Sequence, residues 1–119
     1  MFKEALQEIV DKTDGGFAGL LMDSAGVTID SYAKADALMD INAVGVEFGI
    51  LINSIKKAAE SLEAGNPQEI AIATDKMTTI IRPIGDGYFL ALTLHPGGNF
   101  GKGRYLMRIA VPALLKELS

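Results

Sequence analysis

The stretch HPGGNFGKGR at residues 95–104 is the part of the sequence that most resembles a phosphate-binding loop. Four glycines, Lys102 and Arg104 lie within ten residues, ahead of a run with helical periodicity. A Walker A loop needs a glycine five residues before its Gly-Lys pair and a serine or threonine after it. Pro96 and Gly103 occupy those two positions. The stretch therefore predicts a turn into the last helix, with weak anion binding at the helix N-terminus as the alternative.

Other residues that could do chemistry are few and scattered. The chain has no cysteine and a single histidine, His95, so it cannot build a thiolate metal site or a histidine cluster. DKTDGG at 11–16 resembles the start of a calcium loop, but Met22 stands where the bidentate glutamate is required. We expect no metal, no cofactor and no catalytic residue. An enzyme acting at the glycine-rich stretch stays as an alternative that only Lys102 and Arg104 support.

Composition limits the class of protein further. The 119 residues are 49% hydrophobic and 22% charged, which predicts one globular domain spanning residues 1–119. Eleven basic residues against fifteen acidic ones give a net charge of −4, so nucleic acid is not an expected partner. The first residues contain no signal-peptide core, and no apolar run approaches the roughly 20 residues of a membrane span. We expect a cytoplasmic protein without membrane insertion.

The sequence pattern predicts an α+β fold with the order α-β-β-α-β-β-β-α and a five-stranded antiparallel sheet. Its elements are a helix at 2–12, a hairpin at about 17–32, a long helix at 36–63 with Asp36 as N-cap, strands at 69–74, 77–84 and 87–94, and a final helix at 103–118. The last strand alternates apolar residues on both of its faces, so it should be central in the sheet. Pro112 should kink or split the final helix.

The long helix carries apolar residues on two opposed sides. One stripe, which should pack on the sheet, comprises Leu38, Ile41, Gly45, Phe48, Ile52, Ile55, Ala59 and Leu62. A second, shorter stripe comprises Met39, Ala43, Val46 and Ile50. A helix on one sheet needs a single stripe, so the second stripe predicts contact with another molecule, unless the terminal helices cover it.

Gly45 and Gly49 lie one turn apart inside this helix. Each costs about 1 kcal/mol relative to alanine, so close approach of a neighbour should justify the pair. That neighbour could be the same helix of a second subunit across a two-fold axis, or a large side chain of the same chain. The sequence favours neither.

Three segments, SAGVTIDSY, ADALMDINAVG and GKGRYLMRIA, occur in an order that resembles the roadblock and dynein light chain family. The likeness covers essentially the whole chain and is strongest to small bacterial and archaeal members, such as a gliding-motility regulator that partners a Ras-like GTPase. It implies a profilin-like three-layer α-β-α sandwich and a non-enzymatic homodimer. Such a dimer would regulate or scaffold the GTPase by modulating its hydrolysis or nucleotide exchange. A small-molecule sensory domain of profilin-like fold is the alternative.

The resemblance also implies where the contacts lie. The third strand would pair with its symmetry mate, and the long helix would contribute to the subunit contact and to the GTPase surface. The implied dimer interface comprises Met39, Gly45, Val46, Gly49, Ile70 and Ile72. The implied GTPase-binding surface comprises Asp40, Ala43, Glu47 and Ile50.

Overall fold

The computed structural model describes residues 2–35, 37 and 40–119. Its elements are α1 (Phe2–Lys12), β1 (Gly16–Asp23), β2 (Thr28–Ala33), α2 (Ile41–Ser61), β3 (Ile70–Ala73), β4 (Thr78–Ile84), β5 (Tyr88–Leu94) and α3 (Phe100–Leu118). The strands form one antiparallel sheet in the order β2-β1-β5-β4-β3. The predicted fold class and order of elements are therefore confirmed.

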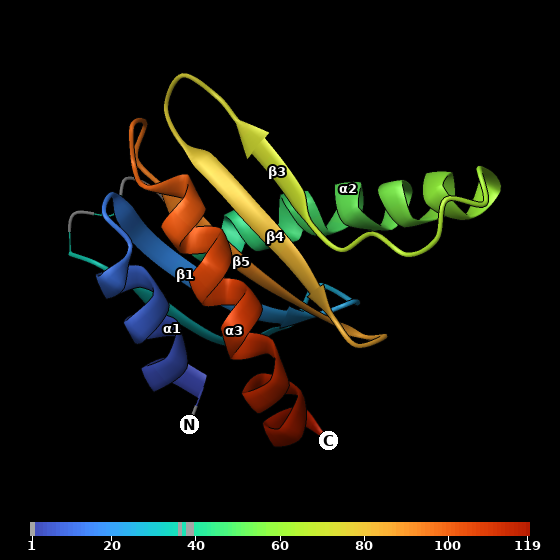
Figure 1. Ribbon diagram of the computed structural model, residues 1–119, viewed down its shortest axis with the longest axis horizontal. Helices are drawn as coiled ribbons and strands as arrows, with labels where there is room; N and C mark the ends of the chain where they lie inside the picture. Colours follow the sequence, from blue (N-terminus) through green and yellow to red (C-terminus); the bar gives the residue numbers. More distant parts are fainter. Residues whose placement is uncertain (1, 36, 38–39) are drawn as a thin grey trace.

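Helices cover both faces of the sheet and make three layers (Figure 1). The helices α1 and α3 lie on one face, and α2 lies on the other and runs past the edge of the sheet. The central strand β5 serves both cores, because alternate side chains of a strand point to opposite faces. Leu90 and Leu92 pack in the core beneath α1 and α3, whereas Phe89 and Ala91 pack in the core beneath α2. The predicted central position of this strand is confirmed.

The start of α2 differs from the prediction. The helix begins at Ile41, and the carboxylate of Asp40 accepts a hydrogen bond from the backbone N of Asn42 at 2.9 Å. Asp40 is thus the N-cap, because it satisfies a backbone donor that the first turn leaves unpaired. The expected N-cap, Asp36, lies outside the described residues.

The last helix also differs from the prediction. It begins at Phe100, three residues earlier than expected, because the side chain of Asn99 caps it by accepting from the backbone N of Lys102 at 3.1 Å. Pro112 does not split α3, which continues to Leu118. Pro112 removes the donor to the carbonyl of Arg108, and both residues are exposed, so water can replace the lost hydrogen bond.

Candidate partner-binding surface

The paired glycines of α2 face the sheet of their own chain. Gly45 and Gly49 are buried. A Cβ on Gly45 would collide with Leu20, and one on Gly49 would lie 3.0 Å from Cε of Met22. Large side chains of β1 therefore fill the groove that the glycines open. This is the intrachain alternative, so the glycines do not supply a smooth face for a second subunit.

The opposite side of α2 is open to solvent. Val46 is 52% exposed and Ile50 is 64% exposed, and Ala43 and Glu47 are exposed beside them. The terminal helices do not cover these residues, because α1 and α3 lie across the sheet (Figure 1). Met39, the fourth member of the predicted stripe, lies outside the described residues. The exposed part of the stripe is thus an apolar surface without a partner in the described chain.

The turn between β1 and β2 extends this apolar surface. The Asp23 carboxylate accepts hydrogen bonds from the backbone N of Ala25 and of Val27, each at 2.9 Å, and so fixes the turn. Val27 is 59% exposed. A cleft of about 180 Å³ separates the turn from α2 and is lined by Ser24, Ala25, Gly26, Val46, Gly49, Ile50 and Asn53. We call Val27, Val46 and Ile50, with this cleft, the α2 outer surface.

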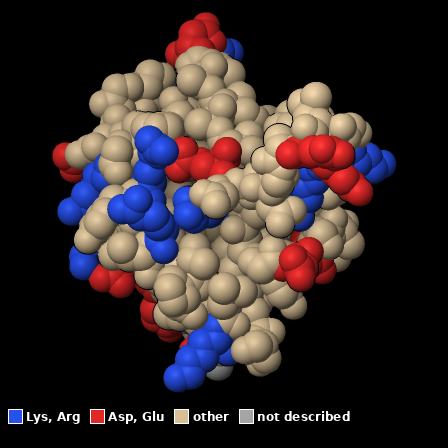
Figure 2. Space-filling model, turned by 45° about the vertical axis from the view of Figure 1, so that its right-hand side comes forward, with Lys and Arg blue, Asp and Glu red and all other residues tan. Residues whose placement is uncertain are grey.

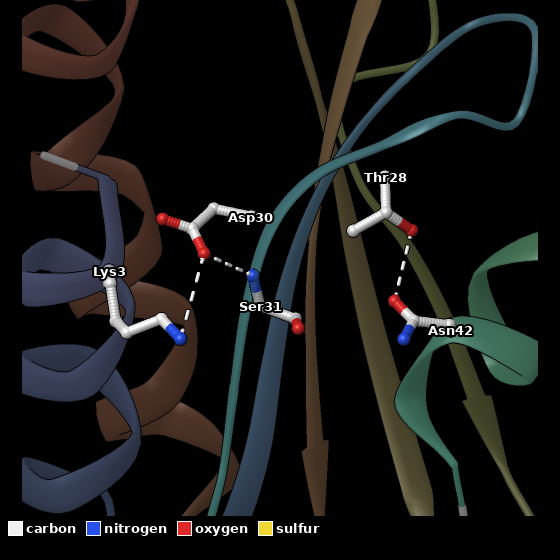
Figure 3. A network of polar contacts seen from close by, with 5 residues as sticks. All are labelled: Lys3, Thr28, Asp30, Ser31 and Asn42. Carbon is white, nitrogen blue, oxygen red and sulfur yellow. Dashed lines mark hydrogen bonds and ion pairs between the residues drawn. The ribbon is translucent and has the colours of Figure 1, made fainter.

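Polar contacts of β2 hold the turn and the helix in place (Figure 3). On the α2 side, the Thr28 hydroxyl donates to Oδ1 of Asn42 at 3.0 Å. On the α1 side, the Asp30 carboxylate accepts from the backbone N of Ser31 at 2.9 Å and lies 4.0 Å from Nζ of Lys3. The start of α2 is therefore tied to the strand that follows the turn, which gives the α2 outer surface a defined shape.

The C-terminal half of α2 extends past the edge of the sheet. The prediction that one apolar stripe packs on the sheet along the whole helix is therefore wrong for this half. Ile41 and Ile52 are buried as expected. Leu62 is 76% exposed, and Ile55 and Leu51 are exposed as well. At about 100° per residue, Ile55 lies on the side of the helix opposite Val46. The overhanging half thus carries a second set of exposed apolar side chains.

The strand β3 is at the edge of the sheet. Among the described residues, only β4 pairs with it, and its outer side carries no strand. Ile70 and Ile72 are half-buried against the core beneath α2, whereas Ala71 and Ala73 are exposed. An open edge of this kind is a template for pairing with another chain.

The glycine-rich stretch is a packed turn, as predicted. The backbone N of His95 donates to the carbonyl of Gly15 at 2.8 Å, and that of Asn99 donates to the carbonyl of Asp14 at 2.7 Å. A Cβ on Gly98 would lie 2.9 Å from the Asp14 carbonyl oxygen, so this glycine permits the close approach. The stretch therefore connects β5 to α3 and packs against the turn that follows α1.

The described residues contain no group of three or more His, Cys, Asp or Glu arranged to hold a metal ion. In the same part of the chain, no helix is long and apolar enough to cross a membrane. His95 stacks on the ring of Phe17, with ring centroids 4.6 Å apart.

The fold is an α+β sandwich with a five-stranded antiparallel sheet, an open edge strand and a single helix on one face, and comparison with known proteins identifies its class. Sequence comparison alone finds no matching family model and no matching curated protein. Structure comparison places the chain with a roadblock/LC7 domain from Streptomyces avermitilis, at a TM-score of 0.87 and 13% identity over 98% of this chain and 96% of that one.

MglC from Myxococcus xanthus is a relative by sequence as well as by structure. It is 34% identical over 96% of each chain, with a TM-score of 0.69. A structure of MglB in a tetrameric arrangement has a TM-score of 0.85 and 20% identity over 95% of this chain and 84% of that one. The chain belongs to the roadblock/LC7 family.

Proposed function

We propose that this protein is a homodimeric, non-enzymatic regulator or scaffold that docks a small Ras-like GTPase on the α2 outer surface. The observation that carries the proposal is the exposure of Val46 and Ile50, which line one cleft, and of Val27, which follows the turn residues 24–26 on the other side of that cleft. Contiguous apolar surface of this kind marks interaction sites on soluble proteins. Membership of the roadblock/LC7 family supports a role in binding rather than in catalysis.

The rim of the α2 outer surface sets the kind of partner. Asp40, as N-cap, and Glu47, on the exposed side of the helix, are both exposed carboxylates, and Ala43 lies between them. An apolar centre with an acidic rim fits a partner that presents apolar side chains flanked by basic ones. Val46 and Ile50 lie one turn apart, so we assign both to the GTPase surface rather than dividing them between GTPase and subunit contact.

The homodimer is assigned to the open edge of β3. Antiparallel pairing of β3 with its symmetry mate would extend the sheet into a second copy and satisfy the unpaired backbone groups. Ile70 and Ile72 would then meet their mates beside the core beneath α2. The oligomeric arrangement of the related MglB structure supports self-association as a property of the fold.

A regulator of this design supplies no reacting group to the GTPase. The chain's three arginines lie on β4 and α3, away from the α2 outer surface, which argues against an arginine finger delivered from α2. Regulation then works by differential affinity. Preference for the hydrolysis-competent conformation accelerates hydrolysis, preference for the nucleotide-free form accelerates exchange, and equal affinity makes a scaffold.

The proposal is tested by measuring capture of a purified Ras-like GTPase from the same organism, loaded with GDP or with a non-hydrolysable GTP analogue. The variant Val46→Glu/Ile50→Glu should weaken capture by about a hundredfold or more, because it puts two charges into the apolar centre. Ala58→Glu/Ser61→Glu is the matched control, since it adds the same charge to exposed positions at the far end of α2. Unchanged capture by the first variant would refute the docking site.

A second variant separates dimerisation from docking. Ala71→Glu/Ala73→Glu places like charges near their symmetry mates on an antiparallel pair, which is unfavourable. We expect it to lower the mass in solution from dimer towards monomer, whereas Ala113→Glu/Ser119→Glu, which adds the same charge at exposed positions near the end of α3, should not. A variant that stays fully dimeric would exclude the β3 edge as the subunit contact and leave the GTPase surface to be judged by its own test.

A further inference from the structure

All three arginines of the chain converge on one cleft. Arg82 comes from β4, and Arg104 and Arg108 come from α3, one helical turn apart. The cleft has a volume of about 210 Å³ and is lined by Glu69, Arg82, Gly101, Arg104, Tyr105 and Arg108. In Figure 2, basic side chains gather on one side of the view with acidic side chains beside them. The fold thus unites residues that lie more than twenty positions apart in sequence.

Only part of this positive charge is neutralised. Nε of Arg104 donates to Oε1 of Glu69 at 2.8 Å. The Arg108 guanidinium lies 5.8 Å from the centre of the Tyr105 ring, and neither Arg108 nor Arg82 forms an ion pair with any described acidic residue. Within the described part of the chain, two guanidinium groups therefore lack a carboxylate partner, in a protein whose net charge is −4.

We propose that this arginine cleft binds an acidic peptide segment of a partner protein. Guanidinium groups match carboxylates with paired N–H donors, and Glu69 already occupies the cleft as one such carboxylate. Carboxylates from an acidic segment would pair with Arg82 and Arg108, so that each of the three arginines would have a carboxylate partner. Tyr105, which is exposed, offers a ring beside the charged groups for the stem of a bound side chain.

The surroundings of the cleft favour carboxylates over the other anions. A phosphate site at the start of α3 would use free backbone N–H groups, but Asn99 already accepts from the backbone N of Lys102 there. Binding to an anionic membrane takes clusters of about four to eight basic residues, which exceeds this cleft. Nucleic acid would be repelled by the acidic chain as a whole. The Glu69 carboxylate already lies against Arg104 in the cleft, so we assign a carboxylate-rich protein segment as the ligand, and binding of inorganic phosphate is an outcome of the test.

The arginine cleft is separate from the α2 outer surface, because α3 lies on the other face of the sheet (Figure 1). Glu69 directly precedes β3, so the cleft lies beside the open edge of the sheet. The protein would then bind two different partners on its two faces. This inference goes beyond the proposed function and does not require a GTPase.

The test is fluorescence anisotropy with a short labelled peptide of alternating glutamate and serine, at about 0.15 M salt. We expect saturable binding by the full chain, and a Kd at least about tenfold higher for Arg82→Glu/Arg108→Glu. The milder Arg82→Gln/Arg108→Gln should weaken binding in the same direction, and it guards against a folding defect in the first variant. Both should leave GTPase capture unchanged.

Lys102→Glu/Lys116→Glu is the matched control, because it makes the same change of net charge at exposed positions of α3 outside the cleft. It should raise the Kd by no more than about two- to threefold, as expected of exposed, screened charges that do not line the cleft. Four results would overturn the proposal: no binding of the acidic peptide, equal loss in the control, tighter binding of inorganic phosphate or phosphatidylserine vesicles than of the peptide, or conversion of the arginine variants to monomers.

Discussion

The two faces of the sheet are covered differently. Two helices, α1 and α3, cover one face, and the core there includes Leu6, Leu92 and Met107. The other face has α2 alone, which buries Ile52 but exposes Ile50 and runs past the edge of the sheet. Apolar side chains on a lone covering helix thus exceed what its own sheet can bury. We propose this excess apolar surface as the docking site of a second molecule.

The largest expected effect separates two isoleucines of the same helix. Ile52→Ala should lower the free energy of unfolding by about 2–5 kcal/mol, because it leaves a cavity in the core beneath α2. Ile50→Ala should change it by no more than about 0.5 kcal/mol, because that side chain is exposed. Urea unfolding at one fixed protein concentration measures both. Equal losses would mean that Ile50 is buried in solution and that the two sides of α2 are not distinct.

The next effect distinguishes the two glycines of α2. Gly45→Ala should lower stability by about 1–3 kcal/mol, because its Cβ would meet the fully buried Leu20. Gly49→Ala should be close to neutral, since the nearest atom is the flexible end of Met22, 3.0 Å from the new Cβ, and alanine favours the helix by about 1 kcal/mol. Thermal unfolding of the pair tests this. A neutral Gly45→Ala would place the helix further from β1 than described.

A gain of stability is expected from Thr79→Val in the same core. Thr79 is fully buried, and its hydroxyl has no hydrogen-bond partner among the described residues. Replacing it by a methyl group of similar size should raise the free energy of unfolding by about 1 kcal/mol. Thr93→Val is the contrasting variant, because the Thr93 hydroxyl donates to the carbonyl of Ala18 at 3.2 Å. A lower free energy of unfolding in Thr79→Val would mean that the Thr79 hydroxyl has a hydrogen-bond partner in solution.

The smallest expected effect is a change of stability with pH that depends on Tyr32, on the face of the sheet covered by α1. Burial, and then the hydrogen bond to Oδ1 of Asp11 at 3.1 Å, raise the pKa of Tyr32 above its ordinary 10.0. A raised pKa means that the native state holds the proton more tightly than the unfolded state. The stabilising contribution is therefore complete below pH 10 and is lost as the pH rises through the native pKa. Urea unfolding at a series of pH values measures the stability difference between wild type and Tyr32→Phe, which should shrink across that window.

The sequence predicted most of the architecture because its signals are local. Alternating residues at 88–94 identify a strand covered on both faces, and GDG at 85–87 marks the turn before it. The sequence pattern predicts a start of α2 at 36, whereas the helix begins at Ile41 with Asp40 as its N-cap, because aspartate at either position is a capping residue type. Local patterns alone could not choose between them.

The surfaces were harder to predict because they depend on distant neighbours. The helical projection found Val46 and Ile50, but it could not show that Leu20, from β1, fills the groove at Gly45. The helical pattern also does not show how far the sheet extends beneath α2, so the exposure of Ile55 could not be predicted from it. Arg82 lies beside Arg104 and Arg108 because of the way α3 packs across β4. The spacing of these residues in the sequence does not predict that packing.

The surfaces left uncovered in one chain are the proposed binding sites for other molecules. Light scattering during size-exclusion chromatography, on the protein mixed with the GTP-loaded GTPase, is the first test of this proposal. We expect a complex containing two copies of the 12.6 kDa chain together with the GTPase, and loss of the GTPase from that complex in Val46→Glu/Ile50→Glu. A chain that elutes at 12.6 kDa, separate from the GTPase at every concentration, would contradict it.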